Sequence, residues 1–286
     1  MYYIVISISA LLFSLMFMFS EGFQKENGAG LNPTMLCTFY SAIFGLVLTL
    51  IVNKFQFNVS MFSFLVAIIY SVACVACNYY TIKALECGNL STFTIFPMSG
   101  GLVLPFIFGL IIGEQFKVTR LICCILIMLS ILLTVDFKSD SQNKTKSKKA
   151  IIYNMAVFLL NGSVGVISTL HQAGAQYNCV DSASFLMLSK IICIIIAGAF
   201  LIKAKCFRVS TKSLFYCGGN AAFNTLGNLL LLIALLHVPA SVQFPIITGG
   251  TIVFSTVIDA LRKVKVTKKQ VLAAIVALCA SCFMAF

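Results

Sequence analysis

The sequence predicts an all-α polytopic membrane protein with about ten transmembrane helices, arranged as two five-helix repeats of inverted orientation. Its composition, its regularly spaced apolar stretches and an internal repeat predict this fold. Of the 286 residues, 60% are hydrophobic and only 10% are charged, whereas a soluble domain carries about 25% charged residues. So few charged side chains do not cover a water-facing surface, but apolar side chains can face lipid.

Apolar stretches of membrane-spanning length recur along the chain. A helix needs about 20 mostly apolar residues to cross the bilayer, and short charged breaks such as NKFQFN and KAKCFRVSTK separate the stretches. The first stretch lacks the basic start and the cleavage site of a signal peptide, so we expect a retained helix. The expected spans are 2–20, 34–52, 61–82, 91–112, 120–136, 150–169, 183–202, 214–236, 241–260 and 270–286.

One longer polar break divides the chain near its middle. Residues 138–149, KSDSQNKTKSKK, are rich in Ser, Lys and Asn, a composition typical of a flexible linker. The sequence therefore predicts a first five-helix repeat over residues 1–137 and a second over residues 150–286.

The two halves match at a single offset of 148 residues, which is the separation of Pro97 and Pro245. Each of these prolines follows a phenylalanine and precedes a glycine pair, and the triplet Lys-Val-Thr recurs at 117–119 and 265–267. Because each half has an odd number of helices, the second half must enter the membrane in the opposite orientation, as in many secondary transporters. Further matches at this offset join Ser20 to Ser168, Gln24 to Gln172 and Ser41 to Ser189.

These features resemble the EamA-like branch of the drug/metabolite transporter superfamily. The resemblance rests on Pro97 with its glycine pair, on GEQFKVTR at 113–120, and on Pro245 with its own glycine pair. The second half departs from the family pattern, because its loop RKVKVTK lacks the Gly-Glu pair. The resemblance implies a central cavity lined mainly by the first four helices of each half, with the fifth and tenth helices bracing the outside.

The net charge of +12 indicates contact with anionic lipid headgroups and a fixed orientation in a plasma or inner membrane, not binding to nucleic acid. The positive-inside rule places the basic loops in the cytoplasm and both termini outside, whereas the family resemblance implies termini inside, so both orientations stay open. The loops of the basic side contain Lys25, Lys83, 138–149, 203–212 and 262–269, and those of the other side contain Lys54, Lys117 and Arg120.

Lys190 lies near the centre of the seventh expected span. Ionisable side chains inside a bilayer are costly and usually mark a functional site. As a cation, Lys190 could hold a carboxylate or a phosphate of a substrate. The alternative is a structural lysine that is paired with backbone carbonyls or held neutral by burial.

Amide side chains supply the other candidate substrate contacts. Asn220, Asn224 and Asn228 are spaced to form one stripe on a helix, and an amide facing lipid would lack hydrogen-bond partners. The alternative is hydrogen bonding between helices, at about 0.6 kcal/mol each. The full predicted substrate-binding set is Lys190, Asn78, Tyr79, Asn161, Asn220, Asn224, Asn228 and Gln243.

Proline and glycine mark matching positions in the fourth and ninth spans. A proline removes a backbone hydrogen bond and can kink a helix, and kinked helices at matching positions of two repeats indicate a transport site. Helix packing by small residues is the alternative. The predicted hinge residues are Pro97, Gly100, Gly101, Pro245, Gly249 and Gly250, with Thr94, Ser99 and Thr248 as polar neighbours.

The function expected from the sequence is secondary transport of a small polar metabolite by alternating access. No catalytic, nucleotide-binding or metal-binding pattern is present, so we expect neither an enzyme nor a cofactor. The twelve cysteines, including the pairs Cys74/Cys77 and Cys279/Cys282, fit apolar packing. A lipid-linked sugar flippase and a non-transporting sensor or scaffold remain as alternatives, as do a monomer or a homodimer and any coupling ion.

Overall fold

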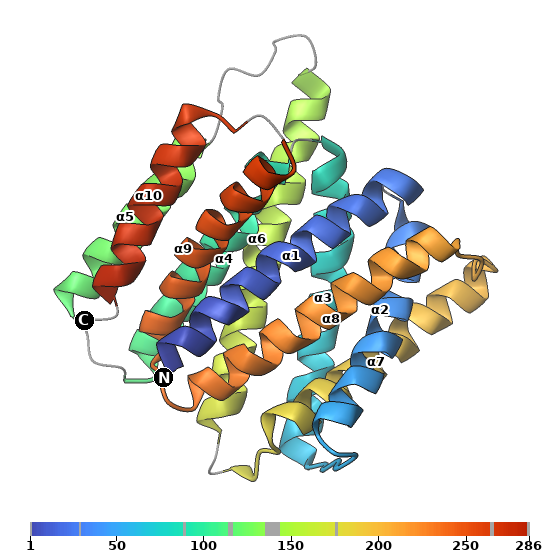
Figure 1. Cartoon of the computed structure of the whole chain (residues 1–286). Helices are drawn as coiled ribbons and strands as arrows, with labels where there is room; N and C mark the ends of the chain where they lie inside the picture. The colour runs from blue at the N-terminus through green and yellow to red at the C-terminus, as the bar shows by residue number, and fades with distance from the viewer. Residues whose placement is uncertain are drawn as a thin grey trace.

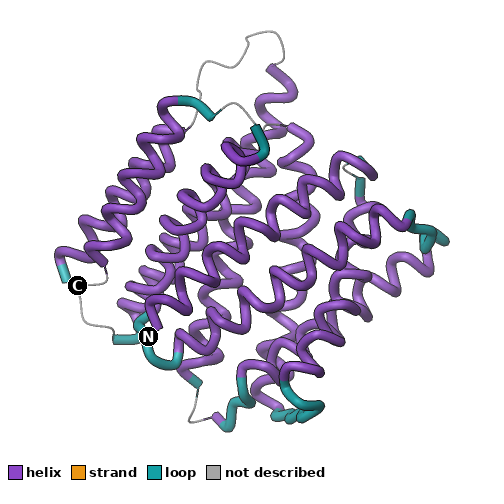
Figure 2. The backbone as a smooth tube through the Cα atoms, in the orientation of Figure 1, coloured by secondary structure: helices purple, strands orange, loops and turns teal. Residues whose placement is uncertain are grey.

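The computed structural model describes residues 2–28, 30–87, 90–113, 117–134, 144–174, 177–263 and 266–284. Within these residues the chain forms ten α-helices and no strand (Figures 1 and 2). The helices are α1 (Tyr2–Asn27), α2 (Leu31–Val52), α3 (Met61–Cys87), α4 (Leu90–Ile111), α5 (Val118–Thr134), α6 (Lys144–Ala173), α7 (Ser182–Ala204), α8 (Thr211–Leu235), α9 (Ala240–Leu261) and α10 (Lys268–Met284).

Local sequence fixes where several helices begin and end. The side chains of Asp181 and Ser210 accept hydrogen bonds from backbone N–H groups in the first turns of α7 and α8, which satisfies donors that have no partner inside the helix. Lys205 ends α7 in the left-handed conformation. The helices therefore start and stop at the charged, turn-forming breaks that separate the apolar stretches.

Several helices extend beyond the spans expected from hydropathy, and α1 and α6 extend the furthest. α1 continues through the polar segment to Asn27, and α6 begins at Lys144. Residues 144–149 of the predicted linker are therefore helical, while residues 138–143 lie outside the described part of the chain. Lysine is a good helix former, so a polar segment next to an apolar span can continue the same helix past the membrane surface.

Seven of the helices are long and apolar enough to cross a membrane. The candidate spans within the described residues are Tyr2–Asn27, Leu31–Val52, Met61–Ala84, Ile151–Ala173, Ser182–Ala204, Thr211–Leu235 and Ala240–Leu261. Outward-facing side chains such as Ile4, Ile69 and Ile195 are 60–67% exposed, which suits contact with lipid and not with water. The chain is therefore a multi-pass, all-α membrane protein.

Helices that are distant in the sequence interleave in space. α1 packs against α8 and α9, and α6 packs against α3 and α4. α2 packs against α7, and α4 against α9. α5 and α10 lie side by side at one edge of the bundle (Figure 1). Each contact has a counterpart between the equivalent helices of the two halves: α1–α8 corresponds to α6–α3, and α1–α9 corresponds to α6–α4.

Small residues allow the closest helix crossings. At Gly100 of α4, an added Cβ would overlap the backbone oxygen of Phe158 in α6, and an added Cβ at Gly162 would lie 2.6 Å from the oxygen of Gly100. Gly250 of α9 similarly lies against Ala10 of α1. The predicted hinge residues Gly100 and Gly250 therefore sit at helix contacts.

The predicted hinge prolines lie within continuous helices. α4 contains Pro97 and Pro105, and α9 contains Pro245. Pro97, Pro245 and Gly249 are all buried, so these positions are covered by neighbouring helices and do not face the lipid.

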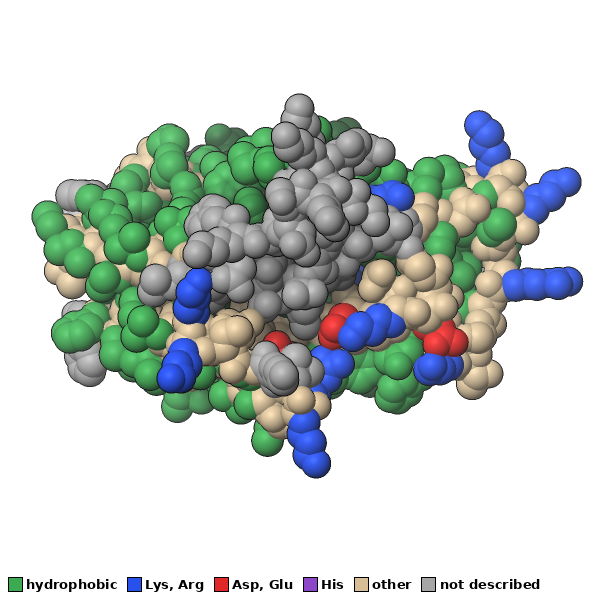
Figure 3. Space-filling view, turned by 90° about the horizontal axis from the view of Figure 1, so that it is seen from above, with side chains coloured by type: hydrophobic (Ala, Val, Ile, Leu, Met, Phe, Trp, Pro, Cys, Tyr) green, Lys and Arg blue, Asp and Glu red, His purple; other side chains and the backbone are tan. Residues whose placement is uncertain are grey.

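Basic side chains gather at one end of the bundle. Figure 3 shows this face, with lysines and arginines around its rim and few acidic side chains. Ion pairs join α1 to α8 through Glu26 and Lys212, 2.5 Å apart, and join α1 to Arg262, which follows α9, through Glu21, 2.9 Å apart. At the opposite end, the described basic residues include Lys54, Lys117 and Arg120.

Candidate functional site

A central cavity with a volume of about 210 Å³ lies between the two halves of the chain. Its lining residues come from eight helices, α1 to α4 and α6 to α9. The described residues of α5 and α10 contribute nothing to the lining. Such a volume suits a small metabolite, since pockets for drug-sized ligands usually occupy about 300–1,000 Å³.

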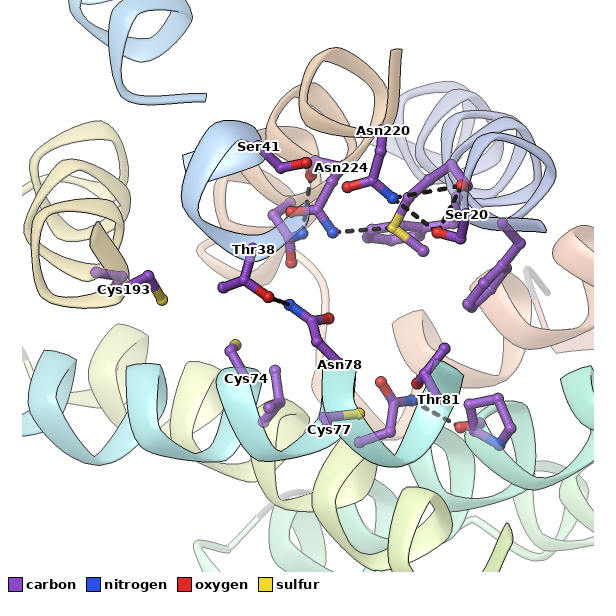
Figure 4. Close-up of a pocket in the computed structure, with 18 of the residues that line it drawn as sticks. Ser20, Thr38, Ser41, Cys74, Cys77, Asn78, Thr81, Cys193, Asn220 and Asn224 are labelled. Carbon is purple, nitrogen blue, oxygen red and sulfur yellow. Dashed lines mark hydrogen bonds between the residues drawn. The ribbon is translucent and has the colours of Figure 1, made fainter. Parts of the chain in front are cut away.

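The asparagine stripe of α8 forms one polar wall of the cavity (Figure 4). The amide nitrogen of Asn220 donates to the hydroxyl oxygen of Ser20 at 2.7 Å, and that of Asn228 donates to the backbone oxygen of Asn224 at 2.8 Å. Tyr70 of α3 reaches across to the side-chain oxygen of Asn228 at 3.5 Å. The stripe thus connects α8 to α1 and α3 while still lining the cavity.

Lys190 of α7 supplies a charged group to the lining. Its ammonium nitrogen donates to the side-chain oxygen of Asn224 at 3.1 Å. The ion pairs found among the described residues do not include Lys190. Gly45 of α2 lies beside the lysine stem, because an added Cβ there would be 3.1 Å from Cε of Lys190.

Two further predicted amides line the opposite side of the cavity. Asn78 of α3 donates to the hydroxyl oxygen of Thr38 at 3.4 Å, and Asn161 of α6 donates to the backbone oxygen of Pro97 at 2.7 Å. An added Cβ at Gly101 would lie 2.9 Å from the amide nitrogen of Asn161. The glycine therefore lets Asn161 approach α4 next to its proline.

The cavity brings together most of the predicted substrate-binding residues, but not all of them. Gln243 is fully buried outside the lining and donates to the backbone oxygen of Leu231 at 2.7 Å. Tyr79 is also outside the lining, and its ring contacts Tyr80 edge to face. Of the three polar neighbours, Thr248 lines the cavity, Ser99 is buried outside it, and the side chain of Thr94 lies outside the described residues.

Several lining residues were absent from the predicted set. The missed side chains carry hydroxyls and thiols, which look like ordinary packing residues when they occur in an apolar span. The repeat offset was the signal that could have found some of them, since Ser20 and Ser168, and likewise Ser41 and Ser189, match at 148 residues and line the cavity. The missed polar lining also includes Thr34, Thr38, Thr81, Cys37, Cys74, Cys77 and Cys193.

Equivalent positions of the two halves meet at the cavity. On α1 and α6, the same offset of 148 residues joins the lining positions Phe13 and Asn161, and also Met16 and Val164. Phe17 corresponds to Gly165 in the same way. On α2 and α7, Ala42 corresponds to Lys190. The offset read from the prolines of α4 and α9 thus also relates the residues around the cavity.

The arrangement can bind a small polar molecule through an ammonium group, amides and hydroxyls. Among the described residues, His, Cys, Asp and Glu side chains form no group of three that could hold a metal ion.

No protein-family model and no curated protein matches the sequence. The fold is similar to that of a solved structure described as "Crystal structure of protein", with a TM-score of 0.70. The alignment covers 98% of each chain at 10% sequence identity. At this identity, the similarity concerns the fold alone.

Proposed function

We propose that this chain is a secondary transporter that moves a small polar metabolite by alternating access between two inverted repeats. The observation that carries the proposal is the central cavity, which draws polar side chains from equivalent positions of both halves. Substrate sites of inverted-repeat transporters lie at the interface between repeats near the bilayer midplane. The EamA-like resemblance of the sequence agrees with this function, and we propose membership of that group.

The proposal needs all ten helices to cross the membrane. Besides the seven long apolar helices, α4 has 22 residues, and α5 and α10 have 17 each. About 17 residues is the lower end of the range for a spanning helix. Five crossings per half then give the two halves opposite orientations, which is a common arrangement in transporters that work by alternating access.

The packing pattern supports an exchange of roles between the two halves. α1 packs on α8 and α9 as α6 packs on α3 and α4, while α2–α7, α4–α9 and α5–α10 pair equivalent helices. In a bundle with this symmetry the two halves can exchange roles, which would give one arrangement open to each side. Rocking of one half against the other would expose the cavity alternately.

The charge distribution supports an orientation with the basic face in the cytoplasm. Figure 1 shows that α1 begins and α10 ends at the end opposite this face. The positive-inside rule therefore places both termini outside, against the implication of the family resemblance. Labelling of Cys206, which is exposed beside the basic loop between α7 and α8, by an impermeant thiol reagent would decide between the two: protection in intact cells supports the proposed orientation.

A thermal-shift screen against a metabolite library tests the proposed function, run in parallel on the native protein and on Lys190→Ala. A ligand that binds the folded state raises its stability by mass action. We expect small polar compounds to raise the melting temperature of the native protein, and we expect proteoliposomes to accumulate the same compounds by counterflow.

The outcomes separate transport from its alternatives. Binding without counterflow would contradict transport and favour a sensor. Stabilisation by lipid-linked sugars instead of soluble compounds would favour a flippase. Stabilisation of both proteins by the same compounds would assign Lys190 a structural role and leave the α8 stripe as the binding surface.

A further inference from the structure

We propose that the cavity selects a small organic monoanion that carries no ammonium group, and that Lys190 holds its carboxylate. This inference rests on the proposed function and names its substrate class. It follows from the charge of the cavity, from the partners of Lys190, and from the apolar groups around them.

The described lining contains one charged side chain. Lys190 is positive, and no Asp, Glu, Arg or His accompanies it among the described residues of the lining. A single charge in a partly buried site is costly, and a bound opposite charge lowers that cost. A monoanion makes the loaded cavity neutral, whereas a zwitterion leaves one positive charge uncompensated and a cation adds a second.

Lys190 keeps hydrogen-bonding capacity for a ligand. An ammonium group has three donors, and the described partner of its nitrogen is the side-chain oxygen of Asn224 at 3.1 Å. That partner is neutral, so it orients the ammonium group without cancelling its charge. The amide nitrogen of Asn224 is already engaged by the sulfur of Met16 at 2.9 Å, which fixes the amide with its oxygen toward the lysine.

Apolar and soft side chains share the lining with the lysine. Figure 4 shows Cys74 and Cys193 beside the open space, with Cys77 further along α3. The aromatic rings of Phe13 and Phe244 also line the cavity. These groups offer no charge and weak hydrogen bonds, so they suit the hydrocarbon part of an organic anion better than a second polar group.

Gly45 is a positioning residue for this site. An added Cβ would lie 2.6 Å from the hydroxyl oxygen of Thr225 and 3.1 Å from Cε of Lys190. The equivalent position of the second half, 148 residues later, is Cys193. The second half, which supplies the lysine, thus has a side chain at this position. The first half has none, and the stem of Lys190 lies beside Gly45 there.

Charged thiol reagents test the selectivity of the cavity without knowledge of the natural substrate. Cys74 lines the cavity, and Cys206 is exposed outside it. We would label the native protein and Lys190→Gln, both in phosphatidylcholine nanodiscs, with anionic, cationic and neutral methanethiosulfonates. Mass spectrometry then gives the rate at each cysteine. The ratio of anionic to cationic rates cancels changes in thiol reactivity, because both reagents attack the same thiolate.

We expect the anionic reagent to label Cys74 faster than the cationic reagent in the native protein. Lys190→Gln should lower that ratio by about tenfold, because a unit charge acts strongly over a few ångströms in a partly buried site. The ratio at Cys206 should not change. Equal ratios at Cys74 in both proteins would overturn the anion site and leave the proposed transport standing.

Two other outcomes would overturn the inference for different reasons. Failure of even the neutral reagent to label Cys74 when the pH is raised until its thiolate forms would indicate a sealed cavity, and would contradict both transport and the anion site. Protection of Cys74 by added phosphatidylglycerol would assign the bound anion to a lipid headgroup and not to a small metabolite.

Discussion

The two halves of this molecule share a framework but differ in chemistry. Equivalent positions of α1 and α6, and of α2 and α7, line the same cavity. The second half places Asn161 and Lys190 where the first half has Phe13 and Ala42. The difference teaches that the repeat preserves the arrangement of helices, while the second half supplies the lysine and four of the five asparagines of the described lining.

The halves also differ in how equivalent helices cross. α4 meets α6 through Gly100 and Gly162, where backbones touch directly. α9 meets α1 through hydroxyls: Ser14 donates to the backbone oxygen of Thr251 at 3.1 Å, and Thr251 donates to that of Ala10 at 3.4 Å. Two facing glycines form the α4–α6 crossing, whereas the α1–α9 crossing adds hydrogen bonds to the contact of Gly250 with Ala10, so substitutions should affect them unequally.

Gly100→Ala should produce the largest effect. Its Cβ would overlap the backbone oxygen of Phe158, which cannot move without separating α4 from α6. We expect a loss of about 3 kcal/mol of stability, measured as a lower melting temperature in detergent. Gly218→Ala is the matched control, since no atom lies within 4 Å of its added Cβ. An equal response of the two variants would contradict the proposed importance of the α4–α6 contact.

The amides of the two halves should contribute unequally to binding. Asn224 accepts a hydrogen bond from charged Lys190, whereas Asn78 makes one long bond to neutral Thr38. We expect Asn224→Ala to weaken the best ligand of the screen about tenfold, and Asn78→Ala less than about threefold. Isothermal titration calorimetry measures both. A larger loss of affinity in Asn78→Ala than in Asn224→Ala would indicate that the first half contributes the main ligand contacts.

Gly45→Ala should act on both stability and binding. The new methyl group must displace Thr225 or the stem of Lys190, at a cost of about 1–2 kcal/mol. The melting temperature should fall, and the shift produced by the ligand should shrink. Gly198→Ala is the control, because its Cβ would meet the edge of the Phe39 ring at 3.1 Å, away from the lysine. An unchanged ligand shift in Gly45→Ala would contradict its positioning role.

Ser14→Ala should have the smallest effect. It removes the bond from α1 to Thr251 but leaves the bond from Thr251 to Ala10. Hydrogen bonds between membrane helices contribute about 0.6 kcal/mol on average, so the melting temperature should change little. A loss near that of Gly100→Ala would show that hydroxyls and glycines hold the two crossings equally strongly.

The fold was more predictable than the ends of its helices. Hydropathy located every helix of the described chain, because a bilayer demands long apolar segments. It misplaced the end of α1 and the start of α6. Hydropathy indicates which residues lie in the lipid, whereas a helix ends where its backbone hydrogen bonds end, and this can be outside the lipid. The polar residues beyond those points are compatible with a helix, so no change in composition marks the boundary.

The cavity lining was predictable at positions where polar side chains are costly in lipid. Lys190 and the α8 asparagines stand out in apolar spans and line the cavity. Gln243 carries the same signal but packs against the backbone of Leu231, since an amide can be satisfied inside the protein as well as by a ligand. Cysteines and hydroxyls carry almost no signal in the sequence, and only the three-dimensional arrangement identifies them as lining residues.

Because the two halves interleave, α1 is synthesised long before the helices that it packs against. The partner of Ser14 on α9 lies 237 residues later in the chain, and at about 5–20 residues per second a ribosome needs roughly 10–50 seconds to reach it. During that interval Ser14 can donate to the backbone oxygen of Ala10 in its own helix, a 3.0 Å bond present in the finished structure. The hydroxyl of Ser14 therefore has a hydrogen-bond acceptor within α1 from the time that this helix enters the membrane until Thr251 is synthesised.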